Sequence, residues 1–148
     1  MARGTATMFN EALLDAWSKV HDLPNDTLKL AIVDATITPA ADDGTPRWAD
    51  YSANEVTNAG NYITGGITLT TVTLTVVAGV TTLAADDVTI AMDALGFTDG
   101  YWGIIVNTSA TNSECIGFID MGGPVSEQAA PVVFEFPDGV VGEWRANA

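Results

Sequence analysis

Side chains branched at Cβ dominate this sequence, which contains 14 Val, 9 Ile and 19 Thr residues but only two Lys. Such residues lose side-chain freedom in a helix and pack well on the pleated surface of a sheet. They occur in short runs separated by clusters of Gly, Pro, Asn and Asp, as in proteins whose strands are joined by turns. We therefore expect a mainly β fold, a Greek-key or jelly-roll-like β-sandwich with one short N-terminal α-helix.

The helix is predicted over residues 8 to 20, where apolar residues recur at spacings of three and four. Thr7 is a candidate N-cap, and Pro24 prevents continuation. This pattern predicts Trp17 in the core and His21 on the surface at the polar end of the helix. The predicted apolar stripe consists of Phe9, Leu13, Ala16, Trp17 and Val20.

Alternation of apolar residues predicts the strands. Leu28 to Val33 indicates a buried first strand, and a slip in the alternation at Thr71 indicates a bulge or a strand break. Ala78-Gly79 is a hairpin signal. The predicted later strands are 72–76, 80–83, 88–92, 101–106, 115–119, 132–136 and 140–144, with turn clusters at 107–113, 122–124 and 137–139.

Residues 38 to 66 form a long loop that carries aromatic side chains. A structureless segment of this length is unusual in a compact domain. We expect contacts with the rest of the domain to order this loop.

The charge balance excludes several classes of partner. The chain has 5 Lys and Arg against 19 Asp and Glu, a formal net charge of -14. Nucleic acids and anionic lipids are held mainly by basic side chains, so we expect no nucleic-acid and no membrane partner. No apolar run suits a spanning helix or an export signal. The length predicts a single domain over 1–148, with an N-terminal arm and helix at 1–22 and the sandwich at 27–146.

The sequence contains few residues that are typical of catalytic sites. His21 and Cys115 are the sole histidine and cysteine, and we interpret them as a surface histidine and a packed thiol. No signature of a common enzyme class or of a metal loop occurs. The pairs 42–43 and 86–87 fit Asp residues that accept local hydrogen bonds. We therefore expect that the protein is not an enzyme and binds neither a cofactor nor a metal. The alternative is a metal site formed by acidic residues that are distant in the sequence but meet in the folded chain.

The other tryptophans have two environments. Trp102 lies in an apolar run and is expected to pack between sheets, whereas Trp48 and Trp144 have charged neighbours. Aromatic residues and Arg are enriched at protein interfaces. These two tryptophans therefore either contact a partner or fold back on their own core.

Five segments and the closing element of the chain are considered together. The segments are 28–33, 51–56, 60–66, 83–88 and 116–123, and the closing element is 134–136 with 139–141. They resemble small virion structural proteins of tailed bacteriophages over about two-thirds of the chain, and the closing element is also typical of that family.

The resemblance implies a decoration, or cement, protein that binds the outer surface of the head and stabilises it. Its partners would be the major capsid protein and further copies of itself, as a trimer first and a dimer second. It would reside in the host cytoplasm before assembly and on the virion capsid surface afterwards. The chain ends and the aromatic loop would supply the contacts, from Ala2 to Met8 and from Trp144 to Ala148. The candidate interface residues are Thr5, Thr7, Trp48, Tyr51, Tyr62, Trp144 and Arg145.

Two other functions remain open on the sequence. A tail or fibre-associated module could recognise host-surface glycan through Trp48, Tyr51 and Tyr62. A small carbohydrate-active enzyme would require two converging carboxylates.

Overall fold

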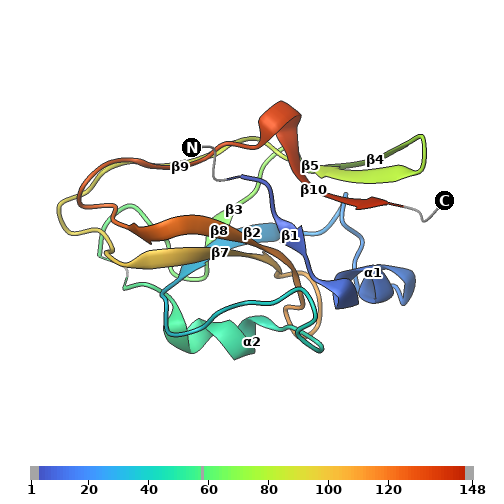
Figure 1. Ribbon diagram of the computed structural model, residues 1–148, viewed down its shortest axis with the longest axis horizontal. Helices are drawn as coiled ribbons and strands as arrows, with labels where there is room; N and C mark the ends of the chain where they lie inside the picture. The colour runs from blue at the N-terminus through green and yellow to red at the C-terminus, as the bar shows by residue number, and fades with distance from the viewer. Residues whose placement is uncertain (1–3, 58, 146–148) are drawn as a thin grey trace.

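The largest sheet has five antiparallel strands in the order β1-β8-β7-β2-β3. Figure 1 shows the computed structural model, which describes residues 4–57 and 59–145. The central strand pair, β2 and β7, is in continuous register from Leu28 opposite Asn107 to Val33 opposite Trp102. The predicted buried strand is confirmed as β2, in which all residues except the half-buried Lys29 are buried, although the short β1 precedes it in the chain. The strands of this sheet are β1 (Thr7–Met8), β2 (Leu28–Val33), β3 (Ile67–Thr68), β7 (Gly100–Asn107) and β8 (Cys115–Val125).

Two smaller antiparallel sheets complete the strands. One has the order β10-β5-β4 and the other pairs β6 with β9. Strands make up 38% of the chain and the two α-helices are short, so the predicted mainly β class is confirmed. These strands are β4 (Thr73–Val77), β5 (Val80–Ala84), β6 (Val88–Ile90), β9 (Val132–Phe134) and β10 (Val140–Arg145).

The core lies between the five-stranded sheet and the smaller sheets. Leu30 of β2 and Phe134 of β9 are buried. Both side chains pack closely on Gly103 of β7, because a Cβ atom built there would lie 3.0 Å from Leu30 and 3.1 Å from Phe134. Leu83 of β5 and Val141 of β10 are also fully buried. Since burial of apolar area is the main stabilising contribution, this shared core holds the sheets together.

Helix α1 (Asn10–Trp17) differs from its prediction in extent and in the face it buries. Thr7 lies in β1, and the N-cap is Phe9, whose side chain makes no capping hydrogen bond. The helix buries Ala12 and Asp15, while Trp17 is 83% exposed. The prediction of Trp17 in the core was therefore wrong. Because residues 12, 13, 14, 16 and 17 are all apolar, the helix pattern alone allowed more than one buried face.

The end of α1 explains why His21 is buried. Lys19 adopts a left-handed conformation (φ 64°), its N–H bonds to Ala16 O at 3.3 Å, and Val20 N–H bonds to Asp15 O at 2.8 Å. This is the Schellman motif, which reverses the chain at a helix C-terminus. His21 consequently returns beneath the helix and is 7% exposed, so the predicted surface position was wrong.

The turn predictions have mixed outcomes. Ala78 and Gly79 have φ values of 50° and 81°, which confirms the hairpin as a two-residue turn with the sense of a type I′ turn. Thr71 (φ 53°) separates β3 from β4 and confirms the predicted break. The predicted turn at 122–124 was wrong, because β8 continues to Val125. Gly122 and Gly123, with φ values of 77° and 118°, adopt the irregular backbone conformation that β8 has near the register shift with β7.

Residues 38 to 66 contain helix α2 (Trp48–Tyr51) and the 3-10 helix η1 (Ser52–Asn54). Trp48 N–H bonds to Ser113 O at 2.9 Å, and Glu55 forms a bridge with Val33 of β2. The predicted ordering of this loop by contacts is confirmed. The short 3-10 helix η2 (Pro137–Gly139) joins β9 to β10.

Candidate docking surface and a buried polar cluster

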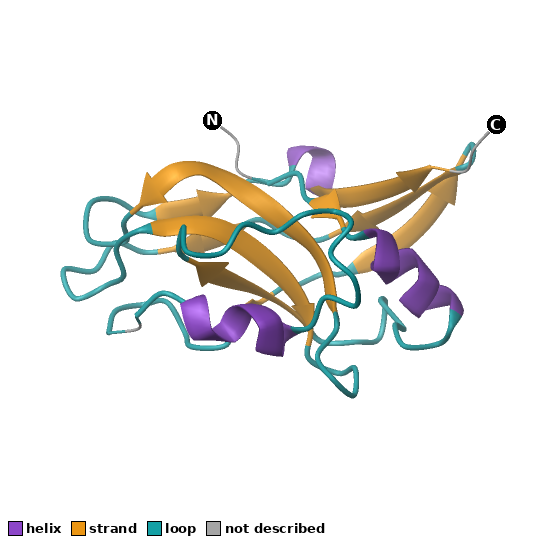
Figure 2. Ribbon diagram, turned by 60° about the horizontal axis from the view of Figure 1, so that its bottom comes forward, coloured by secondary structure: helices purple, strands orange, loops and turns teal. Residues whose placement is uncertain are grey.

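An apolar groove separates α1 from the three-stranded sheet, and Figure 2 shows the two elements side by side. Its part between Leu13, Leu74 and Trp144 has a volume of about 370 Å³. Trp17 is 83% exposed on the helix side, and Val76 is 67% exposed on the strand side. We call this region the α1–β4 groove and define it by Leu13, Trp17, Leu74, Val76 and Trp144.

The groove follows from the helix face and from the position of β4. Because α1 buries Ala12 and Asp15, its larger residues Leu13 and Trp17 point away from the core. Every residue of β4 is exposed, since this strand lies at the edge of its sheet. Contiguous apolar surface on a protein is typical of a binding site.

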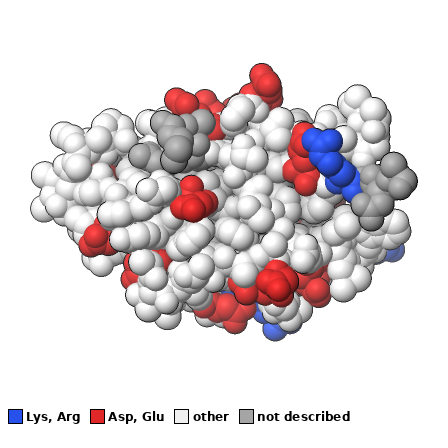
Figure 3. All heavy atoms as spheres, in the orientation of Figure 1, with Lys and Arg blue, Asp and Glu red and all other residues white. Residues whose placement is uncertain are grey.

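The surroundings of the groove carry little charge. No residue from Thr73 to Ala84 is ionisable, although the chain as a whole has a net charge of -14. Figure 3 shows acidic side chains over other parts of the visible face, whereas the tip of the β4–β5 hairpin is uncharged. Arg145 at the rim forms an exposed ion pair with Glu143 at 2.8 Å. The groove is therefore an apolar, nearly neutral region on an acidic protein.

The structure brings only two of the predicted interface residues to the groove. Trp144 lines it, and Arg145 lies at its rim. Thr5 and Thr7 are exposed on the segment that includes β1, and Trp48 is half-buried at the start of α2. Of the predicted terminal contacts, residues 2–3 and 146–148 lie outside the described residues.

Tyr51 and Tyr62 are 2% and 1% exposed, which corrects their predicted place on a partner-binding surface. The Tyr51 hydroxyl donates to Asp43 at 2.8 Å, and its ring stacks on Phe9. The Tyr62 hydroxyl donates to Glu55 at 2.7 Å and accepts from the Ile32 N–H at 3.0 Å. Because each hydroxyl finds a polar partner inside the domain, burial of the two rings is stable.

Sequence reasoning assigned Leu13 and Trp17 to the apolar stripe of the helix, and it did not identify Leu74 and Val76 as groove residues. The excess of apolar residues on α1 was a signal, since a two-turn helix cannot bury all of them. Leu74 and Val76 could not be identified from the sequence. Their exposure depends on the position of β4 at the edge of its sheet, and the strand order that sets this position is not visible in the sequence.

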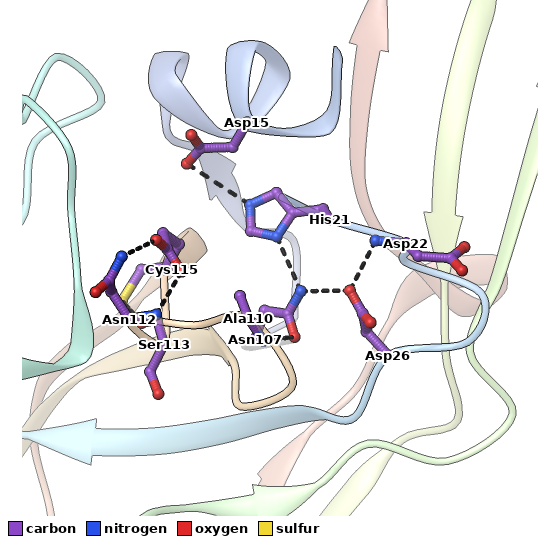
Figure 4. Close-up of polar contacts among 10 residues, drawn as sticks. Asp15, His21, Asp22, Asp26, Asn107, Ala110, Asn112, Ser113 and Cys115 are labelled. Carbon is purple, nitrogen blue, oxygen red and sulfur yellow. Dashed lines mark hydrogen bonds and ion pairs between the residues drawn. The ribbon is translucent and has the colours of Figure 1, made fainter. Parts of the chain in front are cut away.

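The second candidate site is a buried polar cluster between α1 and the loop after β7 (Figure 4). Asn107 Nδ2 donates to His21 Nδ1 at 2.9 Å and also to Asp26. Asn107 Oδ1 accepts the N–H groups of Ser109 and Ala110 at 3.0 and 3.2 Å. These contacts orient the amide, so His21 Nδ1 must be an acceptor and the proton of the neutral ring lies on Nε2.

Burial disfavours charge in this cluster. It lowers the pKa of His21, although Asp15, Glu114 and Asp26 partly oppose that shift. Burial also raises the pKa of Asp15, which the His21 charge partly offsets. The cluster therefore holds a neutral imidazole, and its hydrogen bonds join the chain after α1 to the loop after β7.

Other polar groups also have structural roles. Cys115 is fully buried, as predicted, and burial raises the pKa of its thiol. Asp43 accepts the Ala40 N–H as a local contact, as predicted. Asp87 instead accepts the distant Phe136 N–H, and Asp86 binds the hydroxyl of Thr71. Within residues 4–57 and 59–145, no group of three or more His, Cys, Asp or Glu side chains is arranged to hold a metal ion.

In the part of the chain that the structure describes, no helix is both long and apolar enough to cross a membrane. Comparison of the chain with protein-family models, with curated proteins and with solved structures finds no match. The resemblance to phage virion proteins therefore rests on the sequence segments alone.

Proposed function

We propose that this protein is a non-enzymatic decoration protein that binds the outer surface of a bacteriophage head and stabilises it. The observation that carries the proposal is the α1–β4 groove, where Trp17, Leu13 and Val76 expose apolar area that no described element covers. Such area favours association because burying it against a partner removes it from water.

The charge distribution supports a protein lattice as the partner. A net charge of -14 repels packaged nucleic acid, while the groove itself is nearly neutral. We expect the receiving patch on the major capsid protein to be apolar with a neutral or basic rim, because complementary potentials favour correct docking. The proposal places the protein in the host cytoplasm before assembly and on the capsid surface afterwards.

The proposal includes a fold of the Greek-key or jelly-roll sandwich type, with the five-stranded sheet as one layer. In support, β5 leads directly into β6 and β9 leads through η2 into β10, so that the two smaller sheets together extend along the same core. A rigid β framework of this kind would present the groove in one fixed geometry.

The glycan-binding alternative depended on three aromatic side chains in the loop at 38–66. Burial of Tyr51 and Tyr62 leaves only Trp48, which is itself half-buried. We therefore do not retain that function.

The test is rebinding to stripped heads. The double variant Leu13→Ser/Trp17→Ser should lose most head binding in a cosedimentation assay, and the wild-type protein should raise the temperature at which the heads break. Leu95→Ser, at a 69% exposed apolar residue that does not line the groove, is the matched control and should bind normally. Failure of the wild type to bind heads, or equal binding by the double variant, would refute the proposal.

A further inference from the structure

Strand β4 leaves one edge of the three-stranded sheet without a described neighbour. The turn at Ala78-Gly79 places Val77 and Val80 in a hydrogen-bonded pair, and such pairs alternate along an antiparallel ladder. Thr73, Thr75 and Val77 therefore bond to β5. The main-chain N–H and C=O groups of Leu74 and Val76 point outward from the sheet edge.

This edge lacks the usual protection against pairing. Edge strands commonly carry Lys, Pro, a bulge or an inward-pointing charge. Residues 73 to 77 contain none of these side chains, pair with β5 without a register shift, and are all exposed. An unprotected edge of this kind is a template for another strand.

We propose that a second copy of this chain pairs with the edge, β4 against β4 in antiparallel orientation. The register centred on Thr75 is the one that pairs both outward residues of each copy within β4. Leu74 of each copy lies opposite Val76 of the other and exchanges main-chain hydrogen bonds with it, and Thr75 faces Thr75 across the twofold axis. The two three-stranded sheets then form one continuous sheet of six strands.

The charge distribution favours a second copy of this chain as the partner of the β4 edge. Two chains that each carry a charge of -14 repel one another, so they associate most readily through surface without ionisable groups. The hairpin of β4 and β5 is such a surface, because residues 73 to 84 include no ionisable side chain. The same segment serves both partners, as a twofold interface requires.

This geometry favours a dimer over the trimer that the phage resemblance places first. Each copy has one β4 edge, and pairing with one partner occupies it. The assembly therefore closes at two copies.

The dimer does not depend on binding to a phage head, although it would strengthen such binding. A twofold axis that relates neighbouring antiparallel strands is perpendicular to the sheet, so both copies present the same face of β4 on the same side. Leu74 and Val76 belong to that face, and the two α1–β4 grooves would therefore act together. Two linked sites bind a lattice more tightly than one.

The first experiment is cysteine crosslinking of the purified protein, without heads. Thr75→Cys should give a disulfide-linked dimer under mild oxidation, because directly opposed residues at a non-hydrogen-bonded position lie about 4.5 Å apart between Cα atoms. Thr73→Cys is the matched control. Its two copies would be separated by about four residues along the strand, roughly 13 Å, which is too far for a disulfide. The natural Cys115 is buried and does not interfere.

The second experiment measures mass by analytical ultracentrifugation between about 10 µM and 1 mM, because a small interface gives a weak dimer. The wild type should approach the dimer mass, whereas Val76→Pro should remain monomeric because it removes an outward N–H that β5 does not use. A monomeric wild type, a trimer, or equal crosslinking at positions 73 and 75 would each overturn the β4 dimer. The head-binding assay, which compares the wild type with Leu13→Ser/Trp17→Ser, tests the proposed function separately, so failure of the dimer can be distinguished from failure of head binding.

Discussion

His21 Nε2 lies 3.8 Å from Asp15 Oδ2, and neither atom has a hydrogen-bond partner among the described residues. The distance is too long for a hydrogen bond, but it places two ionisable groups face to face beneath α1. Glu114 and Asp26 also act on the imidazole. A proton on His21 Nδ1 would in addition point at the side-chain N–H group of Asn107, which donates a hydrogen bond to this nitrogen in the neutral ring. We therefore expect the packing of α1 against this cluster to depend on pH.

The first prediction concerns this pH dependence. Burial lowers the pKa of His21 below its ordinary value of 6.5, so the unfolded chain takes up the proton more readily than the folded chain. The contribution of His21 to stability is complete above pH 6.5 and is lost as the pH falls through the lower, folded pKa. His21→Asn, which retains an acceptor near Nδ1, should flatten this decline in the free energy of unfolding measured with urea between pH 5 and pH 8.

Asp15 contributes with the opposite sign. Its pKa is raised above 3.8, so the folded chain binds this proton more tightly, and the stabilisation is lost as the pH rises through the folded value. Asp15→Asn removes the carboxylate that supports the imidazolium and should lower the pKa of His21 further, as measured by NMR titration. An unchanged His21 titration in Asp15→Asn would contradict the coupling.

The second prediction compares two neighbouring glycines. Gly65 and Gly66 both have positive φ values, 87° and 98°, so alanine at either position costs about 1–2 kcal/mol. Only at Gly66 would the Cβ atom also collide with backbone, at 2.8 Å from Leu30 O and 2.9 Å from Ala31 N. Gly66→Ala should therefore destabilise the domain by about 1–3 kcal/mol more than Gly65→Ala, measured by chemical denaturation. Equal losses would show that the loop adjusts.

The third prediction concerns the hydroxyl of Tyr62. Phenylalanine at this position removes the acceptor for the Ile32 N–H and the donor to Glu55. We expect Tyr62→Phe to cost about 1–3 kcal/mol of unfolding free energy, because the Ile32 N–H is left buried without a partner. Tyr101→Phe, at a half-buried tyrosine of β7, controls for the loss of a hydroxyl and should be close to neutral.

The fourth prediction concerns the residue at which the chain reverses after α1. Lys19 has a left-handed backbone (φ 64°), a conformation that glycine adopts without steric cost. Lys19→Gly should be more stable than Lys19→Ala by about 1 kcal/mol, as measured by thermal or urea unfolding. Both variants remove the Lys19 charge, so the difference between their free energies of unfolding reports the cost of the left-handed backbone conformation. If alanine were the more stable variant, the Schellman geometry at this helix end would be incorrect.

Much of the β framework could be predicted from the sequence because its signals are local. Alternation over Leu28 to Val33 identified β2, the pair Ala78-Gly79 identified the hairpin, and the slip at Thr71 identified the break before β4. Each signal depends on the preferred conformations of a few adjacent residues.

The sites could not be predicted in this way, since burial depends on residues far apart in the chain. Tyr62 is buried because its hydroxyl meets β2, thirty residues earlier. His21 is buried because Asn107 of β7 meets it beneath the helix. Trp17 is exposed because Ala12 and Asp15 occupy the buried face of α1.

By itself, the sequence determined the β class, the position of most strands and the acidity of the surface. The order of the strands, the orientation of α1 and the free edge of β4 were decided only by tertiary packing. The physical reason is that backbone preferences act between neighbours in the chain, whereas the choice of which apolar face is buried belongs to the core as a whole.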